Sequence, residues 1–223
     1  VDHCSLMGAT DENVNTWGLV RDVTFQWTII AEGRRPHSMG WLSGARSDRV
    51  SIHHCLFAHN ADRSPKLQGG CYDVVNNVVY NWSHHNAVKL GEGAHVNLVN
   101  NVFIPGPQST DTQACILPED PAQGTQIYLA GNVGPFTPNG TAGQWLNVTF
   151  WEPADGRWIK RRPAPESFRA DKPFPVETIV THSANESYEL VLASAGAKVR
   201  DADDLRVIAE VKGRTGQIGR GSN

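Results

Sequence analysis

A short segment that recurs along the first part of the chain constrains its fold more than any other feature. Each copy is a strand-like run with a central polar pair, found at 23–28, 50–55, 73–78, 97–102 and 127–133. When the second residue of each pair is taken as reference, the equivalent positions are His3, Trp27, His54, Asn77, Asn101 and Asn132. They are spaced by 24, 27, 23, 24 and 31 residues. Repeats of this length indicate stacked units that each bury one face against the next.

The copies are rich in β-branched residues, and no long helical pattern separates them, which favours a β-solenoid over a helical one. We predict an all-β chain with a right-handed parallel β-helix over residues 1–135. A loop-rich segment and a helical tail, together residues 136–223, are expected to pack on this solenoid. The chain begins inside a strand-like run, so we expect it to be a fragment that lacks the N-terminal coils.

Two helices are predicted in the tail. Ser183 and Glu186 form a capping box, and the residues of one helical face follow it: Tyr188, Val191, Leu192 and Ala195. The second helix spans Asp201 to Lys212, with the inward positions Leu205, Ile208 and Ala209. A helical tail of this kind is expected to shield an open end of the solenoid, where strand edges are unpaired.

Stacked coils place equivalent side chains ~4.8 Å apart. We therefore expect an amide ladder at a tight bend, formed by Asn76, Asn77, Asn100, Asn101 and Asn132. The same argument makes His3, His53 and His54 stacked or hydrogen-bonded fillers. Cys4 and Cys55 lie two coils apart, too far for a disulfide. The four cysteines are either free thiols or include a Cys71–Cys115 disulfide.

Charge and hydropathy exclude several functions. The 20 basic and 23 acidic residues give a net charge of −3, which argues against a nucleic-acid-binding domain. No apolar stretch approaches the ~20 residues of a membrane span, so no membrane partner is expected.

Three connections between the repeats carry chemically useful residues. The segment 10–15 groups carboxylate and amide oxygens, which suit a hard cation such as Ca²⁺. The segment 32–40 is basic, and the segment 59–70 holds Arg63 and Lys66 on either side of a proline that fixes the turn. Cations beside an acidic turn are suited to gripping an anionic polymer.

Several of these segments together resemble a known family: Val-Asp-His-Cys-Ser, Thr-Asp-Glu-Asn-Val, Val-Ser-Ile-His-His-Cys-Leu-Phe, Asp-Arg-Ser-Pro-Lys-Leu and Asp-Val-Val-Asn-Asn-Val-Val-Tyr-Asn-Trp. They look like bacterial secreted pectate lyases of polysaccharide lyase family 1, over residues 1 to about 135 and again in the tail. The resemblance implies Ca²⁺-dependent β-elimination of α-1,4-linked polygalacturonate, which leaves 4,5-unsaturated ends. It also implies a secreted, monomeric enzyme that acts on this acidic polysaccharide.

Residue by residue, the resemblance makes Arg63 the catalytic base. It makes Lys66, Arg34 and Arg35 substrate-binding residues, and Asp11, Glu12 and Asn15 a partial Ca²⁺ site. The family's other Ca²⁺-binding aspartates would lie upstream of residue 1. Three positions depart from the family pattern: Asn15 stands for an acid, Met39 for a lysine and Gln68 for a second arginine.

Two other classes of function stay open. A β-helical glycoside hydrolase needs two carboxylates ~5–9.5 Å apart, and Asp11 with Asp62 is the available pair. A non-catalytic polysaccharide-binding β-helix is supported by the departures at Asn15, Met39 and Gln68. An unsaturated product separates the lyase from both.

Overall fold

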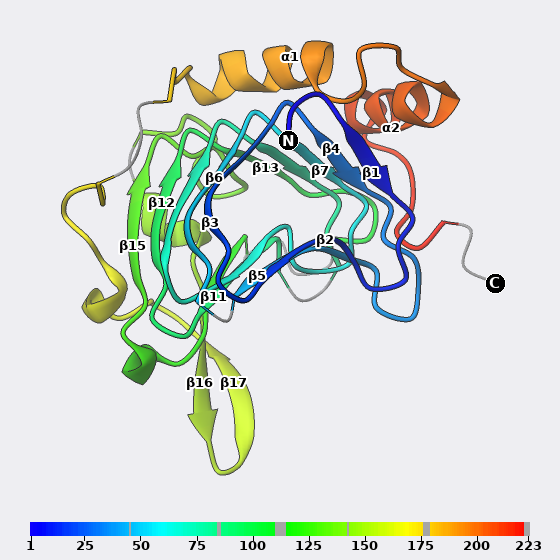
Figure 1. Ribbon diagram of the computed structural model, residues 1–223. Helices are drawn as coiled ribbons and strands as arrows, with labels where there is room; N and C mark the ends of the chain where they lie inside the picture. Colours follow the sequence, from blue (N-terminus) through cyan, green and yellow to red (C-terminus); the bar gives the residue numbers. More distant parts are fainter. Residues whose placement is uncertain (45, 84–85, 110–114, 142, 176–178, 221–223) are drawn as a thin grey trace.

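The computed structural model describes the whole chain except residues 45, 84–85, 110–114, 142, 176–178 and 221–223. The chain winds into stacked coils, and each coil contributes one short strand to each of three five-stranded sheets (Figure 1). All strand pairs within these sheets are parallel. The predicted parallel β-helix is confirmed.

We name each sheet by its central strand. The β7 sheet contains β1 (Ser5–Met7), β4 (Ile29–Ala31), β7 (Leu56–Ala58), β10 (Val78–Tyr80) and β13 (Val102–Ile104). The β8 sheet contains β2 (Glu12–Trp17), β5 (Met39–Gly44), β8 (Lys66–Gln68), β11 (Val88–Gly91) and β14 (Ile116–Pro118). The β9 sheet contains β3 (Arg21–Gln26), β6 (Asp48–His53), β9 (Cys71–Val75), β12 (His95–Val99) and β15 (Gln126–Ala130).

The interior of the coils is apolar and closely filled. Trp41, Tyr72 and Phe57, which come from the three different sheets, are among its fully buried large side chains. Because each coil buries this face against its neighbours, the outward side chains are the ones that distinguish the sheets from one another.

An asparagine ladder runs along the bend between the β9 and β7 sheets. The Asn77 amide donates to Asn101 Oδ1 and the Asn101 amide donates to Asn132 Oδ1, each at 3.0 Å. The same oxygens accept the backbone N–H groups of Asn77 and Asn101, which leaves the ladder fully hydrogen-bonded. The predicted ladder is confirmed for these three residues.

The predicted alignment is wrong by one residue at its centre. Leu56 pairs with Val78, so Cys55 lies in the ladder column with Asn77, and His54 lies in the column of Asn76. The column of His54 is left-handed in every coil: His3, Trp27, His54, Asn76, Asn100 and Gly131 all have positive φ. Asn76 and Asn100 therefore form the bend, while their neighbours form the ladder.

The histidines stack as predicted. His3 and His54 lie on opposite sides of the Trp27 ring, with centroid distances of 6.1 and 4.3 Å. His54 Nδ1 lies 3.0 Å from His53 Nδ1, and its Nε2 lies 3.0 Å from His182 Nδ1. Burial lowers the pKa of His54 to about 4, and the neighbouring imidazoles act in the same direction.

After β15 the chain caps one end of the solenoid. Val148 and Trp151 form bridges to the β8 sheet beyond β14, and Arg169 bridges to Ile127 of β15. The 3-10 helices of this region are η1 (Pro121–Gln123), η2 (Gln144–Asn147) and η3 (Glu166–Phe168), and the strands are β16 (Phe150–Ala154) and β17 (Arg157–Arg161). The last two form an antiparallel hairpin that projects from the solenoid (Figure 1).

A strap, residues 170–175 and 179–182, then crosses the outer face of the β9 sheet. Two asparagines each hold one strap residue through both of its backbone groups. The Asn97 amide binds the N–H and C=O of Phe174 at 2.9 and 3.1 Å, and the Asn76 amide binds those of His182 at 3.0 and 2.7 Å. These two clamps lead the chain to its helices.

The helices cover a side of the solenoid and not an end, so the expected shielding of an open end is wrong. Helix α1 (Ala184–Ser194) begins at the predicted capping box, and α2 (Ala202–Gly213) follows it. Both pack on outward residues of the β7 sheet such as Ile29, Leu56 and Val78 (Figure 1). These strands are apolar on both faces, which is why they need a cover.

The inward face of α2 also differs from the prediction. Leu205 is 57% exposed and Ala209 is exposed, while the buried positions are Asp204, Val207, Ile208 and Val211. These buried positions have helical spacing, but the first of them is an aspartate. A prediction from apolar residues alone therefore assigned the buried face to a neighbouring side of the helix. The predicted Ile208 and the whole predicted face of α1 are buried or packed on the core.

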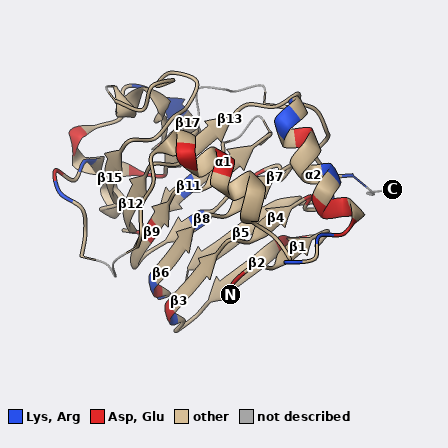
Figure 2. Cartoon of the chain, turned by 90° about the horizontal axis from the view of Figure 1, so that it is seen from above, with Lys and Arg blue, Asp and Glu red and all other residues tan. Residues whose placement is uncertain are grey.

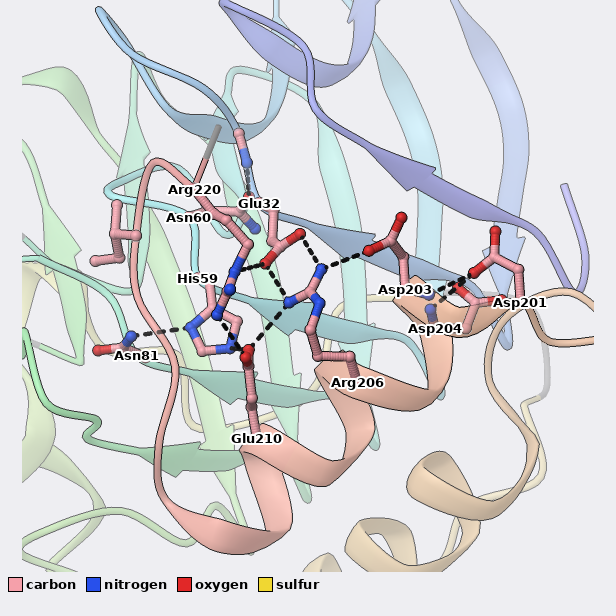
Figure 3. A network of polar contacts seen from close by, with 12 residues as sticks. Glu32, His59, Asn60, Asn81, Asp201, Asp203, Asp204, Arg206, Glu210 and Arg220 are labelled. Carbon is pink, nitrogen blue, oxygen red and sulfur yellow. Dashed lines mark hydrogen bonds and ion pairs between the residues drawn. The ribbon is translucent and has the colours of Figure 1, made fainter. Parts of the chain in front are cut away.

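A network of ion pairs fixes α2 to the coils (Figure 3). Arg206 grips both oxygens of Glu32 at 2.7 Å and also contacts Glu210 at 3.2 Å. Glu210 in turn lies 3.2 Å from His59 Nε2, while Asn81 donates to His59 Nδ1 at 2.9 Å. Because Nδ1 accepts, Nε2 carries the proton, and it faces Glu210 without forming a hydrogen bond to it. Burial lowers the pKa of His59.

All four cysteines are free: Cys4, Cys55, Cys71 and Cys115. Within the part of the chain that the structure describes, no helix is long and apolar enough to cross a membrane.

Candidate active face

The outer face of the β8 sheet holds most of the charged residues that the sequence singled out. Leu42 pairs with Lys66, and Lys66 pairs with Lys89 in the next coil. The two lysines are thus one coil apart, ~4.8 Å along the stack. The positions of β8 and β11 are visible in Figure 2, where both strands carry basic residues.

The Glu119 carboxylate contacts both lysines. Glu119 Oε1 lies 2.9 Å from Lys89 Nζ, and Glu119 Oε2 lies 3.8 Å from Lys66 Nζ. The Lys89 ammonium also lies 4.3 Å from the centre of the Trp151 ring. Burial lowers the pKa of Lys66, and the charge of Glu119 opposes this shift. With two ammonium groups and one carboxylate, this pair retains positive charge for an anionic ligand.

Arg63 reaches this face from the connection between β7 and β8. Its backbone is left-handed, with φ of 57°, and its N–H donates to Asp62 Oδ1. The Asn86 amide also donates to Asp62 Oδ1, at 2.9 Å, so this carboxylate fixes the turn. Since Asp62 pairs with Met39 and Met39 with Glu12, the turn lies two coils above Glu12. The guanidinium spans that distance and contacts Glu12 Oε1.

The structure therefore brings together Arg63, a predicted base, and Glu12, a predicted metal ligand. The other two predicted ligands lie apart from this pair. Asp11 lies 3.1 Å from His37 Nδ1, with both side chains exposed, and Asn15 is exposed on β2. Among the described residues, no group of three or more acidic, histidine or cysteine side chains is placed to hold a metal. Asp11, Glu12 and Asn15 do not by themselves fit Ca²⁺, because the Glu12 carboxylate is occupied by a cation.

The two predicted arginines of the basic loop lie off this face. A Cβ on Gly8 would be 3.5 Å from Arg34 Nε, so Arg34 lies against the β1–β2 connection. Arg35 lies against Gly219 near the end of the described chain. It borders a cavity that His37, Met39 and Asp62 also line.

Sequence reasoning missed Lys89, Glu119 and two tryptophans on this face. Lys66-Leu67 and Lys89-Leu90 recur 23 residues apart, which is one coil, so the repeat itself could have identified Lys89. Trp17 is 53% exposed, and its ring lies over Gly44 of the next coil. Exposed aromatic rings of this kind suit the apolar faces of sugar rings.

The positions that depart from the family pattern also have partners. Met39 stands between Glu12 and Asp62 in the stack. The Gln68 amide donates to Glu92 Oε1. Asp62, one member of the carboxylate pair that a hydrolase would need, accepts two hydrogen bonds as a turn-forming group. This arrangement gives the hydrolase alternative no support.

Comparison with known proteins finds fungal relatives for half of the chain. The chain is similar to the probable pectate lyase C of Aspergillus terreus, with 36% identity over 114 residues. The proteins of the same name from Aspergillus fumigatus and Emericella nidulans are 35% and 34% identical over 114 and 111 residues. Each match covers 50% of this chain but only 26–27% of the relative. The chain matches no protein-family model.

The chain is thus a parallel β-helix with distant homology to fungal probable pectate lyases. The matched region is about a quarter of the length of those relatives. Their activity, substrate and partners enter for this chain as proposals.

Proposed function

We propose that the chain carries a pectate-lyase-like active face that eliminates across the glycosidic bond of polygalacturonate. The observation that carries this proposal is the group of three cations, Arg63, Lys66 and Lys89, on the outer face of the β8 sheet. The distant homology to probable pectate lyases supports the same class of reaction. The proposal takes the protein to be secreted, because its substrate is an extracellular acidic polymer, and to be a monomer, as the resemblance implies.

The roles of the three cations follow from the chemistry of elimination. Lys66 and Lys89 bind the uronate carboxylate and stabilise the enolate-like charge that develops when the C5 proton leaves. Arg63 takes that proton in its neutral form, after its own proton has passed to solvent; the ammonium groups of Lys66 and Lys89 favour this neutral form. The electron pair forms the C4–C5 double bond, the C4–O4 bond breaks, and the departing oxygen is protonated from solvent. To reach the substrate, the Arg63 guanidinium has to leave Glu12.

Calcium enters only as an expectation of the resemblance. The described residues do not form a Ca²⁺ site on their own, so no step of this mechanism uses the ion. A requirement for Ca²⁺ would show that ligands outside these residues contribute.

The test is the ultraviolet absorbance of unsaturated uronates released from polygalacturonate, with Ca²⁺ and then with chelator. It is applied to this chain and to the longer polypeptide that the resemblance predicts. We expect product in at least the longer protein, and Arg63→Ala is expected to lower the rate by ~10²–10⁴-fold. The exposed Arg157→Ala, at the first residue of β17, is the matched control. Elimination at the normal rate in Arg63→Ala would remove Arg63 from the mechanism.

A second function is favoured by one specific contact. Arg63, the predicted base, and Glu12, a predicted metal ligand, are engaged with each other in an ion pair. Such an arrangement suits a face that binds the polymer without catalysing a reaction. A non-catalytic polysaccharide-binding β-helix predicts retention of polygalacturonate without any absorbance change, in this chain and in the longer protein. Reducing sugar without absorbance would instead indicate hydrolysis.

A further inference from the structure

The outer face of the β9 sheet carries a second polar row, on a different side of the solenoid from the cations. Strand pairing places five outward residues at one level, in the order Thr24, Ser51, Asp73, Asn97 and Tyr128. Successive members are therefore one coil apart, ~4.8 Å. The row combines two hydroxyls, a carboxylate, an amide and a phenol.

Asp73 is the unusual member of this row. It is only 2% exposed, and its Oδ1 accepts a hydrogen bond from the Asn97 amide at 2.8 Å. Its Oδ2 is buried and has no hydrogen-bond partner among the described residues. A buried carboxylate oxygen without a donor is costly, so an oxygen in this state calls for a ligand.

A groove of about 390 Å³ lies over this part of the row, lined by Asp73 together with Thr24, Ser51, Asp22, Arg49 and Pro175. This volume is within the ~300–1,000 Å³ of small-molecule sites. Arg49 forms a bidentate pair with Asp22 at 2.6 and 2.8 Å and also contacts Asp48 at 2.9 Å. The cation at the rim is thus already neutralised, and it is not available to Asp73.

The chemistry of the groove selects its ligand. Burial raises the pKa of Asp73 to about 6, so the carboxylate is ionised at neutral pH and only accepts hydrogen bonds. An anionic ligand would be repelled by Asp73, and Arg49 at the rim is already paired and does not offset this repulsion. No metal-binding group of three ligands occurs here or elsewhere in the described chain. The ligand therefore donates hydrogen bonds and carries no negative charge.

The spacing of the row distinguishes a neutral sugar from a simple ammonium ion. Ser51 and Thr24 extend the site from Asp73 by one and two coils, ~5 and ~10 Å. A point charge would contact only Asp73, whereas the hydroxyls of a sugar can also bond to these two side chains. We propose that this groove is a carbohydrate-binding site that takes a neutral sugar residue, with Asp73 accepting from its hydroxyls. The site is independent of the proposed lyase face.

The test titrates the chain at pH 7.5 with three probes: methyl α-galactoside, galacturonate and methylammonium. Binding is measured by saturation-transfer NMR and calorimetry. We expect the neutral galactoside to bind at least tenfold more tightly than either charged probe. Equal or tighter binding of galacturonate or methylammonium, or no binding of the galactoside, overturns the proposal.

Asp73→Asn is the sharpest variant. Its amide oxygen still accepts from Asn97, but the free acceptor becomes an NH₂ donor. We expect at least a tenfold loss of galactoside affinity, while Asp155→Asn, an exposed change of the same kind in the β16–β17 turn, leaves it unchanged. Circular dichroism confirms the fold. If Asp73→Asn does not fold, Ser51→Ala removes a half-exposed hydroxyl and should lower affinity several-fold. Unchanged affinity in the folded Asp73→Asn, or in Ser51→Ala used in its place, overturns the role of the row.

Discussion

The β7 and β8 sheets are built from the same coils, yet their outer faces differ in kind. Outward residues of the β7 sheet are apolar, and α1 and α2 cover them. Outward residues of the β8 sheet include Lys66, Lys89 and Trp17, and neither helix packs on them. The repeat thus specifies the interior, and the outward residues of each strand decide whether a face is structural or available to ligands.

The largest loss of stability is expected on the outer face of the β7 sheet, which α1 and α2 cover. Arg206→Met removes one of the two arginines that bind Glu32 and Glu210, whose side chains are only 10% and 13% exposed. Because Arg220 still contacts both carboxylates, the loss is that of the charge-assisted hydrogen bonds of Arg206, about 2–3 kcal/mol. Urea unfolding measures the loss, with the exposed Lys212→Met of the same helix as control. A loss no greater than that of Lys212→Met would show that apolar packing alone holds α2.

His54, at the bend between the β9 and β7 sheets, should make the free energy of unfolding depend on pH. The pKa of His54 is about 4 in the native state, below its ordinary value of 6.5, so the unfolded chain takes up the proton first. Native stability therefore falls as the pH drops from 6.5 towards 4, by about 2 kcal/mol from this residue at pH 5.

His54→Asn isolates this contribution. Asparagine occupies the same left-handed column in the next two coils, at Asn76 and Asn100, so the backbone accepts it. Unfolding free energies at pH 7 and pH 5 should differ by about 2 kcal/mol less in the variant than in the original chain. His37→Asn, at an exposed position, is the control. An unchanged pH slope in His54→Asn would assign the dependence to other groups.

On the outer face of the β8 sheet, we expect a substitution to change activity and not stability. Lys89→Met should lower kcat/KM for polygalacturonate about tenfold, equivalent to about 1.4 kcal/mol. Lys66 remains to balance Glu119, so the fold should persist. The exposed Lys172→Met provides the matched loss of charge. If kcat/KM stays unchanged in Lys89→Met, the lysine pair does not bind the substrate.

The smallest effect is expected at the edge of the covered face. The Tyr80 hydroxyl donates to the Thr215 carbonyl at 2.7 Å, just beyond α2. Tyr80→Phe removes this single bond and should cost about 0.5–1 kcal/mol. Hydrogen exchange of residues 214–220 should accelerate while that of the coils does not. Equal acceleration in both would mean that the tail and the coils open together.

The comparison also shows which parts of the structure the sequence could reveal. Strand spacing predicted the coils, and the Lys-Leu repeat contained the signal for Lys89. The one-residue error between His54 and Asn77 has a physical origin. Adjacent His-His and Asn-Asn pairs can be superposed in two ways, and only the backbone shows which member is left-handed and which faces the ladder.

Other features depend on contacts that are remote in sequence. Asn97 and Phe174 are 77 residues apart, and Asn76 and His182 are 106 apart. No local pattern indicates that these asparagines hold the strap. Likewise, the sequence places Arg63 near a predicted cation site but does not show which residue it contacts. Only the stacking of the coils shows that its guanidinium reaches Glu12.

The two clamps have a mechanical consequence. Asn76 and Asn97 attach the strap through side-chain amides, whereas the coils are held by backbone ladders and the buried asparagine column. Force applied at the C-terminus would therefore load α2 first, then α1, and then one clamp at a time. We expect the tail to peel away in steps at low force, and the solenoid beneath it to yield later as a separate unit.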